Sequence, residues 1–142
     1  MNNAHPRAVL DTSTVIQLPL LRDPAALPGE PLITAITLAE LSVGPLVTDD
    51  AHEREIRQTH LQQAEADFDP LPFDDQAARA FGRVAASLRR SGRKSAARAY
   101  DALIAATALA HGLPVYTTNA SDFDGIEGLQ VVSVEVTPRP EV

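Results

Sequence analysis

Two polar side chains follow directly after an apolar run in the last quarter of the chain. Residues 113–116 (Leu-Pro-Val-Tyr) read as a buried strand, and Asn119 and Asp122 come just after it. Asp11 stands in the same place after an earlier apolar run at residues 8–10 (Ala-Val-Leu). In an open parallel sheet, ligands bind outside the carboxyl ends of the strands. We therefore expect these three side chains at one edge of a sheet.

Two further acids lie inside predicted helices. Asp101 shares its helix face with alanines at 97, 105 and 108, which are small residues suited to close packing. Aspartate is a poor helix former and is costly to bury without a partner. Glu40 has a similar setting between Ala39 and Leu41. Both acids are therefore candidates for a functional site.

Several carboxylates that face one cleft repel one another and raise each other's pKa unless a cation neutralises them. The chain has no cysteine, and its four histidines fall into no spacing typical of zinc ligands. Ligands that are all oxygen suit Mg²⁺ or Mn²⁺, one or two of which orient a water for attack on a phosphodiester. The combination predicts phosphodiester hydrolysis, with a metal site formed by Asp11, Glu40, Asp101 and Asp122.

Each candidate also has a purely structural interpretation. Asp11 precedes Thr-Ser and fits a helix N-cap, and Asp122 fits the cap of a short helix after it. Asn119 fits a turn, and Glu40 fits a solvated helix position. Asp101 is the hardest to explain in this way, because its apolar surroundings would require a buried salt bridge. The candidate partners for that bridge are Arg98 and Arg7.

The length and composition predict one compact domain. With 142 residues and 44% hydrophobic composition, the chain can bury a substantial core. We predict that the domain spans residues 1–137 and that residues 138–142 form a loose tail. No apolar stretch reaches the roughly 18 residues needed to span a bilayer, and the first residues lack the pattern of a signal peptide. We expect a cytoplasmic protein.

The charge is unevenly distributed along the chain. The formal net charge of −7 argues against a broad nucleic-acid interface, because phosphate binding normally requires a basic surface. However, seven of the twelve Lys and Arg residues lie within residues 79–98, and no acid interrupts them. This segment is either a solvated helix face or a surface that guides RNA towards the acids.

The periodicity of apolar residues predicts strands that alternate with helices, which is typical of a mainly parallel sheet in an α/β fold. We predict strands at 8–10, 31–34, 115–117 and 129–134, and a brief extended piece at 70–72. We predict helices through 15–16, at 37–43, 49–68, 74–90 and 95–111, and a loop or short helix at 121–126.

Four segments, in this order, resemble PIN-domain ribonucleases, specifically the VapC-type toxins of bacterial toxin–antitoxin pairs. They are LDTS at 10–13, TLAEL at 37–41, ARAYDALIAATALAHGLPVYTTNASDF at 97–123, and GLQVV at 128–132. The resemblance implies a PIN-like fold with a central five-stranded parallel sheet flanked by helices. It also implies an Mg²⁺- or Mn²⁺-dependent endoribonuclease that is inhibited by a cognate VapB-type antitoxin.

The resemblance also assigns roles to individual residues. Asp11, Glu40, Asp101 and Asp122 match the four acids of the family in chain order, and Asp124 is a spare acid beside them. Two polar residues match those that hold the acid cluster through hydrogen bonds, namely Ser13 and Asn119.

Partners are implied by the resemblance as well. PIN toxins usually dimerise, and we expect a homodimer bound to antitoxin, with helices around residues 36–66 at the dimer interface. The antitoxin is expected to place a basic or polar side chain in the acidic cleft. Thr118 departs from the family, where a larger or basic residue is frequent, so one phosphate contact is either missing or supplied from elsewhere.

Three other protein classes compete with this interpretation. A dehalogenase-type phosphatase needs a second Asp two residues after the first, and position 13 is Ser. A receiver domain needs paired acids near its first strand, where this chain has only Asp11. The remaining alternative is a catalytically silent PIN-fold binding module, which would be marked by loss of one of the four acids. All four are present.

Overall fold

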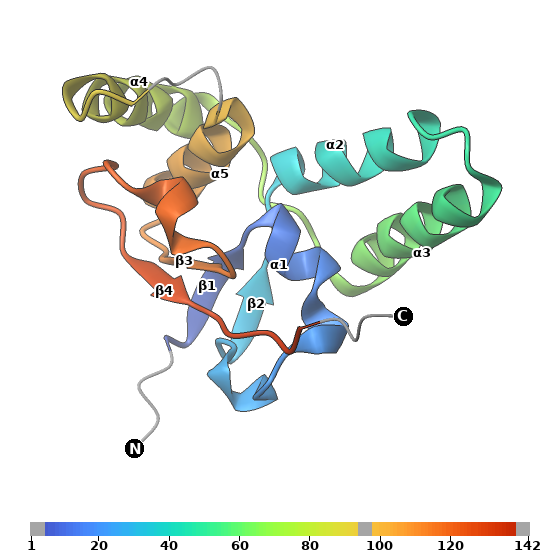
Figure 1. Cartoon of the computed structure of the whole chain (residues 1–142). Helices are drawn as coiled ribbons and strands as arrows, with labels where there is room; N and C mark the ends of the chain where they lie inside the picture. The colour runs from blue at the N-terminus through green and yellow to red at the C-terminus, as the bar shows by residue number, and fades with distance from the viewer. Residues whose placement is uncertain (1–4, 94–97, 139–142) are drawn as a thin grey trace.

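The computed structural model describes residues 5–93 and 98–138 (Figure 1). Its centre is a parallel sheet of four short strands in the order β2-β1-β3-β4. The strands are β1 at Arg7–Leu10, β2 at Glu30–Leu32, β3 at Val115–Thr117 and β4 at Val131–Ser133. Because every strand runs in the same direction, all four carboxyl ends lie at one edge of the sheet, as the sequence predicts.

The two central strands are buried on both faces. Val9 pairs in register with Leu32 of β2 and with Val115 of β3, and Leu10 pairs with Tyr116. Side chains alternate between the two faces along a strand, so neighbouring residues of β1 enter different cores. A continuous apolar run, rather than an alternating one, is what a parallel sheet covered on both faces requires.

The prediction of five strands is corrected to four among the described residues. The extended piece at 70–72 makes only a single parallel bridge, between Leu71 and Thr34. The backbone N–H of Leu71 donates to the carbonyl of Ile33 at 2.9 Å. Its neighbours on both sides are prolines, Pro70 and Pro72, which have no N–H to donate. The ladder therefore cannot extend, and a fifth strand does not form there.

Helices surround the sheet and agree closely with those predicted. They are α1 at Thr12–Ile16, α2 at Ala35–Val43, α3 at Ala51–Asp67, α4 at Asp75–Arg90 and α5 at Ala99–Ala110. Short 3₁₀ turns lie at Leu18–Leu20, Pro24–Ala26, Gly44–Leu46 (η3) and Ala120–Phe123 (η5). The predicted start of the last helix at 95 and most of the predicted tail lie outside the described residues. None of the described helices combines the length and apolar character needed to cross a membrane.

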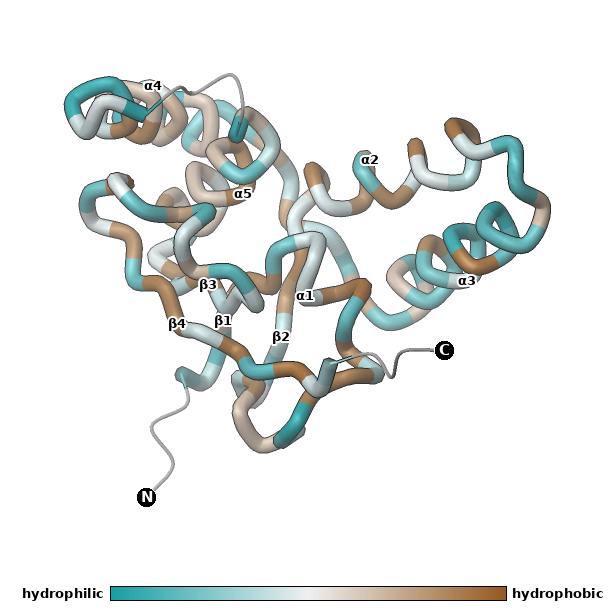
Figure 2. The backbone as a smooth tube through the Cα atoms, in the orientation of Figure 1, coloured by the Kyte–Doolittle hydropathy of each residue, from teal (hydrophilic) through white to brown (hydrophobic). Residues whose placement is uncertain are grey.

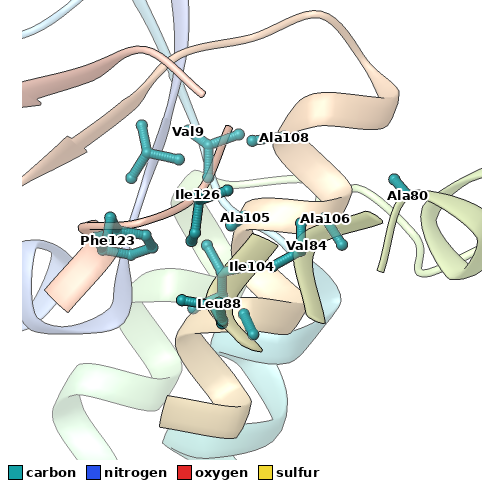
Figure 3. Packing of buried hydrophobic residues seen from close by; sticks show 12 residues of the cluster. Val9, Ala80, Val84, Leu88, Ile104, Ala105, Ala106, Ala108, Phe123 and Ile126 are labelled. Carbon is teal, nitrogen blue, oxygen red and sulfur yellow. The ribbon is translucent and has the colours of Figure 1, made fainter. Parts of the chain in front are cut away.

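The α4–α5 pair packs over one face of the sheet (Figure 1). Figure 3 shows Leu88 and Val84 of α4 beside Ile104 of α5, with Phe123 from η5 and Val9 from the sheet completing the cluster. A second, smaller core on the other face contains Leu10, Tyr116, Ile33, Leu41 and Ala64.

The α2–α3 pair extends to one side of the sheet as a helical hairpin (Figure 1). Figure 2 shows that α3 is hydrophilic along most of its length. Within the hairpin helices, the buried residues are Thr37 and Leu41 of α2 and Ala64 of α3. The hairpin is therefore attached to the body by few buried side chains.

Candidate active site

The four predicted acids come from four different elements around the carboxyl edge of the sheet. Asp11 directly follows β1, Glu40 lies in α2, Asp101 in the first turn of α5, and Asp122 in η5. The mutual influence of these carboxylates on each other's pKa shows that the fold brings the four together. The four acids are therefore near enough to influence one another, and the prediction that they form one metal site stays a prediction.

Asp11 is both a helix cap and a member of the acidic cluster. Its side chain is 2% exposed and accepts hydrogen bonds from the backbone N–H of Thr14 at 3.2 Å and from the Thr14 hydroxyl. The other carboxylate oxygen, Oδ2, accepts from Thr117 Oγ1 at 2.8 Å and from Ser13 Oγ at 3.2 Å. The predicted N-cap and the predicted contact with Ser13 are both present, so the structural interpretation does not exclude the functional one.

Glu40 is a half-buried member of the cluster rather than a freely solvated helix residue. Thr12 Oγ1 donates to Glu40 Oε1 at 2.7 Å, and Thr37 Oγ1 lies 2.9 Å from the Thr12 oxygen. Burial raises the pKa of Glu40 above its usual value, the Thr12 hydrogen bond opposes this, and the Asp11 carboxylate raises the pKa further. The α2 acid is therefore held towards the end of β1 by a hydroxyl from α1.

Asp101 has the most perturbed pKa of the cluster. The pKa of Asp101 is raised to about 6, with burial as the largest cause, and Arg98 opposes the rise only slightly. The carboxylates of Asp122, Asp11 and Glu40 raise it too, in that order of size. The predicted alternative, a buried salt bridge from Asp101 to Arg98 or Arg7, is wrong for the described residues. Arg98 pairs with Asp122, and Arg7 pairs with Glu30.

Asp122 is anchored by an amide and a guanidinium. Asn119 Nδ2 donates to Asp122 Oδ1 at 3.2 Å, as predicted, and Arg98 Nη1 donates to the same oxygen at 3.3 Å and to the Ser121 carbonyl at 2.9 Å. The prediction that Asp122 caps a helix is wrong, since it lies inside η5, whose N-cap position is occupied by Asn119. Asp124 is exposed and pairs with Arg93 Nη2 at 3.3 Å.

Threonine hydroxyls connect the site, and the sequence analysis did not identify them. Thr14 Oγ1 accepts from the backbone N–H of Thr118 at 3.1 Å, and Thr117 Oγ1 accepts from that of Asn119 at 3.0 Å. Thr118 Oγ1 lies 3.2 Å from Ser13 Oγ, so the residue that departs from the family pattern supports Ser13. Their positions in the sequence could have indicated this role, because each threonine is adjacent or close to a predicted site residue.

The donor set fits a hard divalent cation by its chemistry. All four candidate ligands are carboxylates, and oxygen donors without Cys or His suit Mg²⁺ or Mn²⁺. In the described part of the chain, no three Asp, Glu or His side chains are arranged so that they could hold an ion directly. Instead, Asp11 and Glu40 accept hydrogen bonds from neighbouring hydroxyls, and Asp122 accepts one from Arg98.

Two hollows adjoin the cluster on either side of Glu40. The larger, of about 410 Å³, lies between α1, α2 and α3, and its lining includes Thr12, Ile16 and His60. The smaller, of about 200 Å³, is lined by Ala39, Glu40, Val43 and Tyr100. The acid of α2 is thus reachable from two directions.

Comparison with known proteins places the chain in one family. The PIN domain family matches residues 8–129. "Ribonuclease VapC5" of Mycobacterium tuberculosis is 38% identical over 138 residues, which is 96% of this chain and 98% of that protein. "Ribonuclease VapC1" of Rickettsia felis is 30% identical over 106 residues, covering 75% of this chain and 78% of that protein.

A solved structure shows the same fold. The crystal structure of VapBC-5 from Mycobacterium tuberculosis, a member of the VapBC family of toxin-antitoxin systems, superposes with a TM-score of 0.78. The two chains share 37% sequence identity, and the match covers 91% of this chain and 99% of the other.

Proposed function

The chain belongs to the VapC-type PIN-domain ribonuclease family, and from this premise we propose that it is a metal-dependent endoribonuclease and the toxin of a type II toxin–antitoxin pair. The reaction would be hydrolysis of an RNA phosphodiester by an activated water. The alternative is a catalytically silent PIN-fold module that binds partners in a regulatory complex.

The observation that carries the proposal is the shared environment of the four acids. Burial and three neighbouring carboxylates together raise the pKa of Asp101 to about 6. Strongly perturbed acids in a cleft are typical of functional sites. A purely structural acid would be expected to have a dedicated cationic partner. Arg98 lowers the pKa of Asp101, but it is the smallest of the causes, and its ion pair is with Asp122.

A divalent ion, Mg²⁺ or Mn²⁺, is the cofactor that suits four carboxylate ligands by their chemistry. Asp11, Glu40, Asp101 and Asp122 would hold it, and such an ion polarises a phosphodiester and lowers the pKa of a bound water. Excess negative charge in the cluster favours cation binding, because a cation relieves the repulsion that raises the carboxylate pKa values.

Neighbouring polar residues would keep the acids in place for this chemistry. Thr12 holds Glu40, Ser13 and Thr117 hold Asp11, and Asn119 holds Asp122 through the hydrogen bonds described above. Positioned ligands of this kind reduce the reorganisation needed when substrate binds.

The arginines of α4 and the loop after it would guide RNA. Several of them already form exposed ion pairs within the chain, among them Arg79 with Asp75 and Arg90 with Glu127. Exposed pairs of this kind are weak and exchange readily with phosphate. This supports a small RNA contact area rather than broad wrapping.

The cognate antitoxin and a second copy of the chain are the proposed protein partners. Exposed apolar side chains gather at the turn between α2 and α3, where Val43 is 50%, Leu46 83% and Val47 66% exposed. An acidic cleft is suited to a basic antitoxin side chain, which would have to compete with Arg98 at Asp122. A complex whose antitoxin left all four acids open to solvent would count against that part of the proposal.

The decisive experiment is cleavage of RNA by purified protein with Mg²⁺, with Mn²⁺ and with EDTA. Asp101→Asn keeps the side-chain volume and removes one carboxylate, so we expect its cleavage rate to fall by at least 100-fold, in line with loss of a group that acts in the transition state. Asp49→Asn is the matched control, because Asp49 is an exposed acid outside the cluster.

Three outcomes separate the hypotheses. Discrete fragments that require the metal and disappear only in Asp101→Asn support the nuclease. Equal cleavage by wild type and both variants indicates a contaminating ribonuclease and removes support for this site. If none of the proteins cuts RNA while each still binds the antitoxin, the silent binding module replaces the proposal.

A further inference from the structure

One aromatic side chain of this protein is exposed, and it lies beside the acidic cluster. The chain has six aromatic residues, two Tyr and four Phe, and all six are among the described residues. Tyr116 and Phe123 are fully buried, and the other three Phe are partly buried. Tyr100 is 59% exposed. Burying an aromatic ring is favourable, so an exposed ring next to a candidate active site calls for a functional explanation.

Tyr100 shares a hollow with one of the site carboxylates. It immediately precedes Asp101 in the first turn of α5. Together with Ala39, Glu40 and Val43 of α2, it lines the hollow of about 200 Å³ described above. The ring therefore lies beside Glu40, where α5 and α2 approach each other.

The composition of this hollow suits a nucleobase better than a phosphate. Ala39 and Val43 offer apolar surface, Tyr100 offers a flat ring, and Glu40 offers an acceptor for an exocyclic amino group. A phosphate at the same place would meet only the carboxylate and be repelled. Proteins that recognise single-stranded RNA stack unpaired bases on exposed aromatic side chains.

We propose that Tyr100 is a base-stacking residue that holds one nucleobase of a single-stranded RNA beside the phosphodiester to be cut. The proposal rests on the proposed ribonuclease function and adds to it a residue that contacts a base of the substrate. A base stacked on Tyr100 lies beside Asp101, its neighbour in the chain, and Glu40, its neighbour across the hollow. The adjoining phosphodiester would then lie near the cation that these carboxylates would hold. The predicted selectivity is therefore for unpaired RNA.

The test compares Tyr100→Leu with Tyr100→Phe on a defined RNA oligonucleotide that the wild type cuts. Tyr100→Leu keeps an apolar side chain without a ring, and we expect kcat/KM to fall about tenfold, mainly through KM, as for loss of one stacked base. Tyr100→Phe keeps the ring and should stay within about twofold of wild type. Thermal melts of both variants establish that they fold, which the exposure of Tyr100 favours.

A second oligonucleotide locates the stacked base. Versions of the substrate carry a single abasic position on either side of the cut. One of them should weaken wild-type cleavage about tenfold and have no further effect on Tyr100→Leu, because the two changes remove the same contact. Additive losses at every position would show that the ring does not stack there and would overturn the proposal.

Failure of this proposal is distinct from failure of the proposed function. If the wild type cuts RNA and Tyr100→Leu cuts it equally well, Tyr100 has no stacking role. If that variant instead loses assembly with a second copy or with antitoxin, the ring is a protein contact and the proposal is again overturned. If the wild type cuts no RNA, fluorescence titration with the same oligonucleotide decides, and equal affinities of wild type and Tyr100→Leu would refute stacking.

Discussion

The two helical pairs of this molecule differ sharply in how much they bury. The α4–α5 pair contributes Val84, Leu88, Ile104 and several alanines to the core against the sheet. In the α2–α3 pair, α3 runs from Ala51 to Asp67, and its one buried residue is Ala64. Helices gain most of their stability from packing an apolar face. The first pair therefore holds the fold together, and the second is available for contacts outside the chain.

The acidic cluster bridges these two regions. Asp101 belongs to the tightly packed α5 and Glu40 to the sparsely packed α2, while Asp11 and Asp122 follow the sheet strands. The short hydrogen bond from Thr12 to Glu40 links α2 to the end of β1. A partner that binds the α2–α3 hairpin is thereby placed to influence one carboxylate of the site without disturbing the core.

The same substitution made in each region should give very different losses of stability. Ile104 of α5 is fully buried, so Ile104→Ala should lower the free energy of unfolding by about 3 kcal/mol. Ile56 of α3 is partly exposed and lines the larger hollow, so Ile56→Ala should cost less than about 1 kcal/mol. Urea denaturation of both variants beside the wild type measures the difference. Equal losses would contradict the contrast between the two pairs.

The sequence predicted this division of the fold in part. Buried elements need apolar side chains, so the periodic apolar residues of 74–90 predicted a helix and the apolar run at 8–10 predicted a strand. Both elements, α4 and β1, lie nearly where expected. The two prolines of the extended piece at 70–72 explain why it makes only one bridge. The resemblance to a five-stranded family predicted a strand that these prolines do not allow. Local backbone chemistry was the better guide at this edge of the sheet.

The candidate acids were identifiable because each one breaks a local pattern. Asp101 interrupts an alanine-rich helix, and Asp11 ends a buried strand. The supporting hydroxyls were not identifiable, because threonine is an ordinary strand residue and Thr117 reads as part of a buried strand. The pairing of Arg98 with Asp122 joins α5 to η5, and such a contact follows only from tertiary structure.

The acids placed between the two regions should lower the stability of the folded protein. The folded-state pKa of Asp101 is about 6, above its unfolded value of 3.8, so the charged form is disfavoured in the folded protein. Asp101→Asn should therefore raise the free energy of unfolding at pH 7 by about 1 kcal/mol, after a discount for the partial exposure of the side chain. Glu40→Gln should have the same sign, because the pKa of Glu40 is also raised.

The sign of the pH dependence provides the check. The destabilisation by Asp101 is fully present above pH 6, declines as pH falls between about 6 and 3.8, and is absent below that range. Thermal melts in EDTA at pH 7.5, 5 and 3.5 should show that the gain in stability of Asp101→Asn over wild type shrinks in that order. An advantage that stayed constant or grew towards low pH would show that Asp101 is not a strained carboxylate.

The smallest effect on stability is expected at the turn between α2 and α3, although its effect on assembly should be clear. Leu46 of η3 is 83% exposed, so Leu46→Ser should change the free energy of unfolding by less than about 0.5 kcal/mol. If the hairpin is a contact surface, the loss of this apolar side chain should still weaken self-association or antitoxin binding, which sedimentation velocity measures. Ala86→Ser, on the exposed side of α4, is the matched control and should leave assembly unchanged. Equal assembly by both variants would assign the exposed apolar residues of the hairpin no binding role, and the contrast between the two helical pairs would then be one of packing alone.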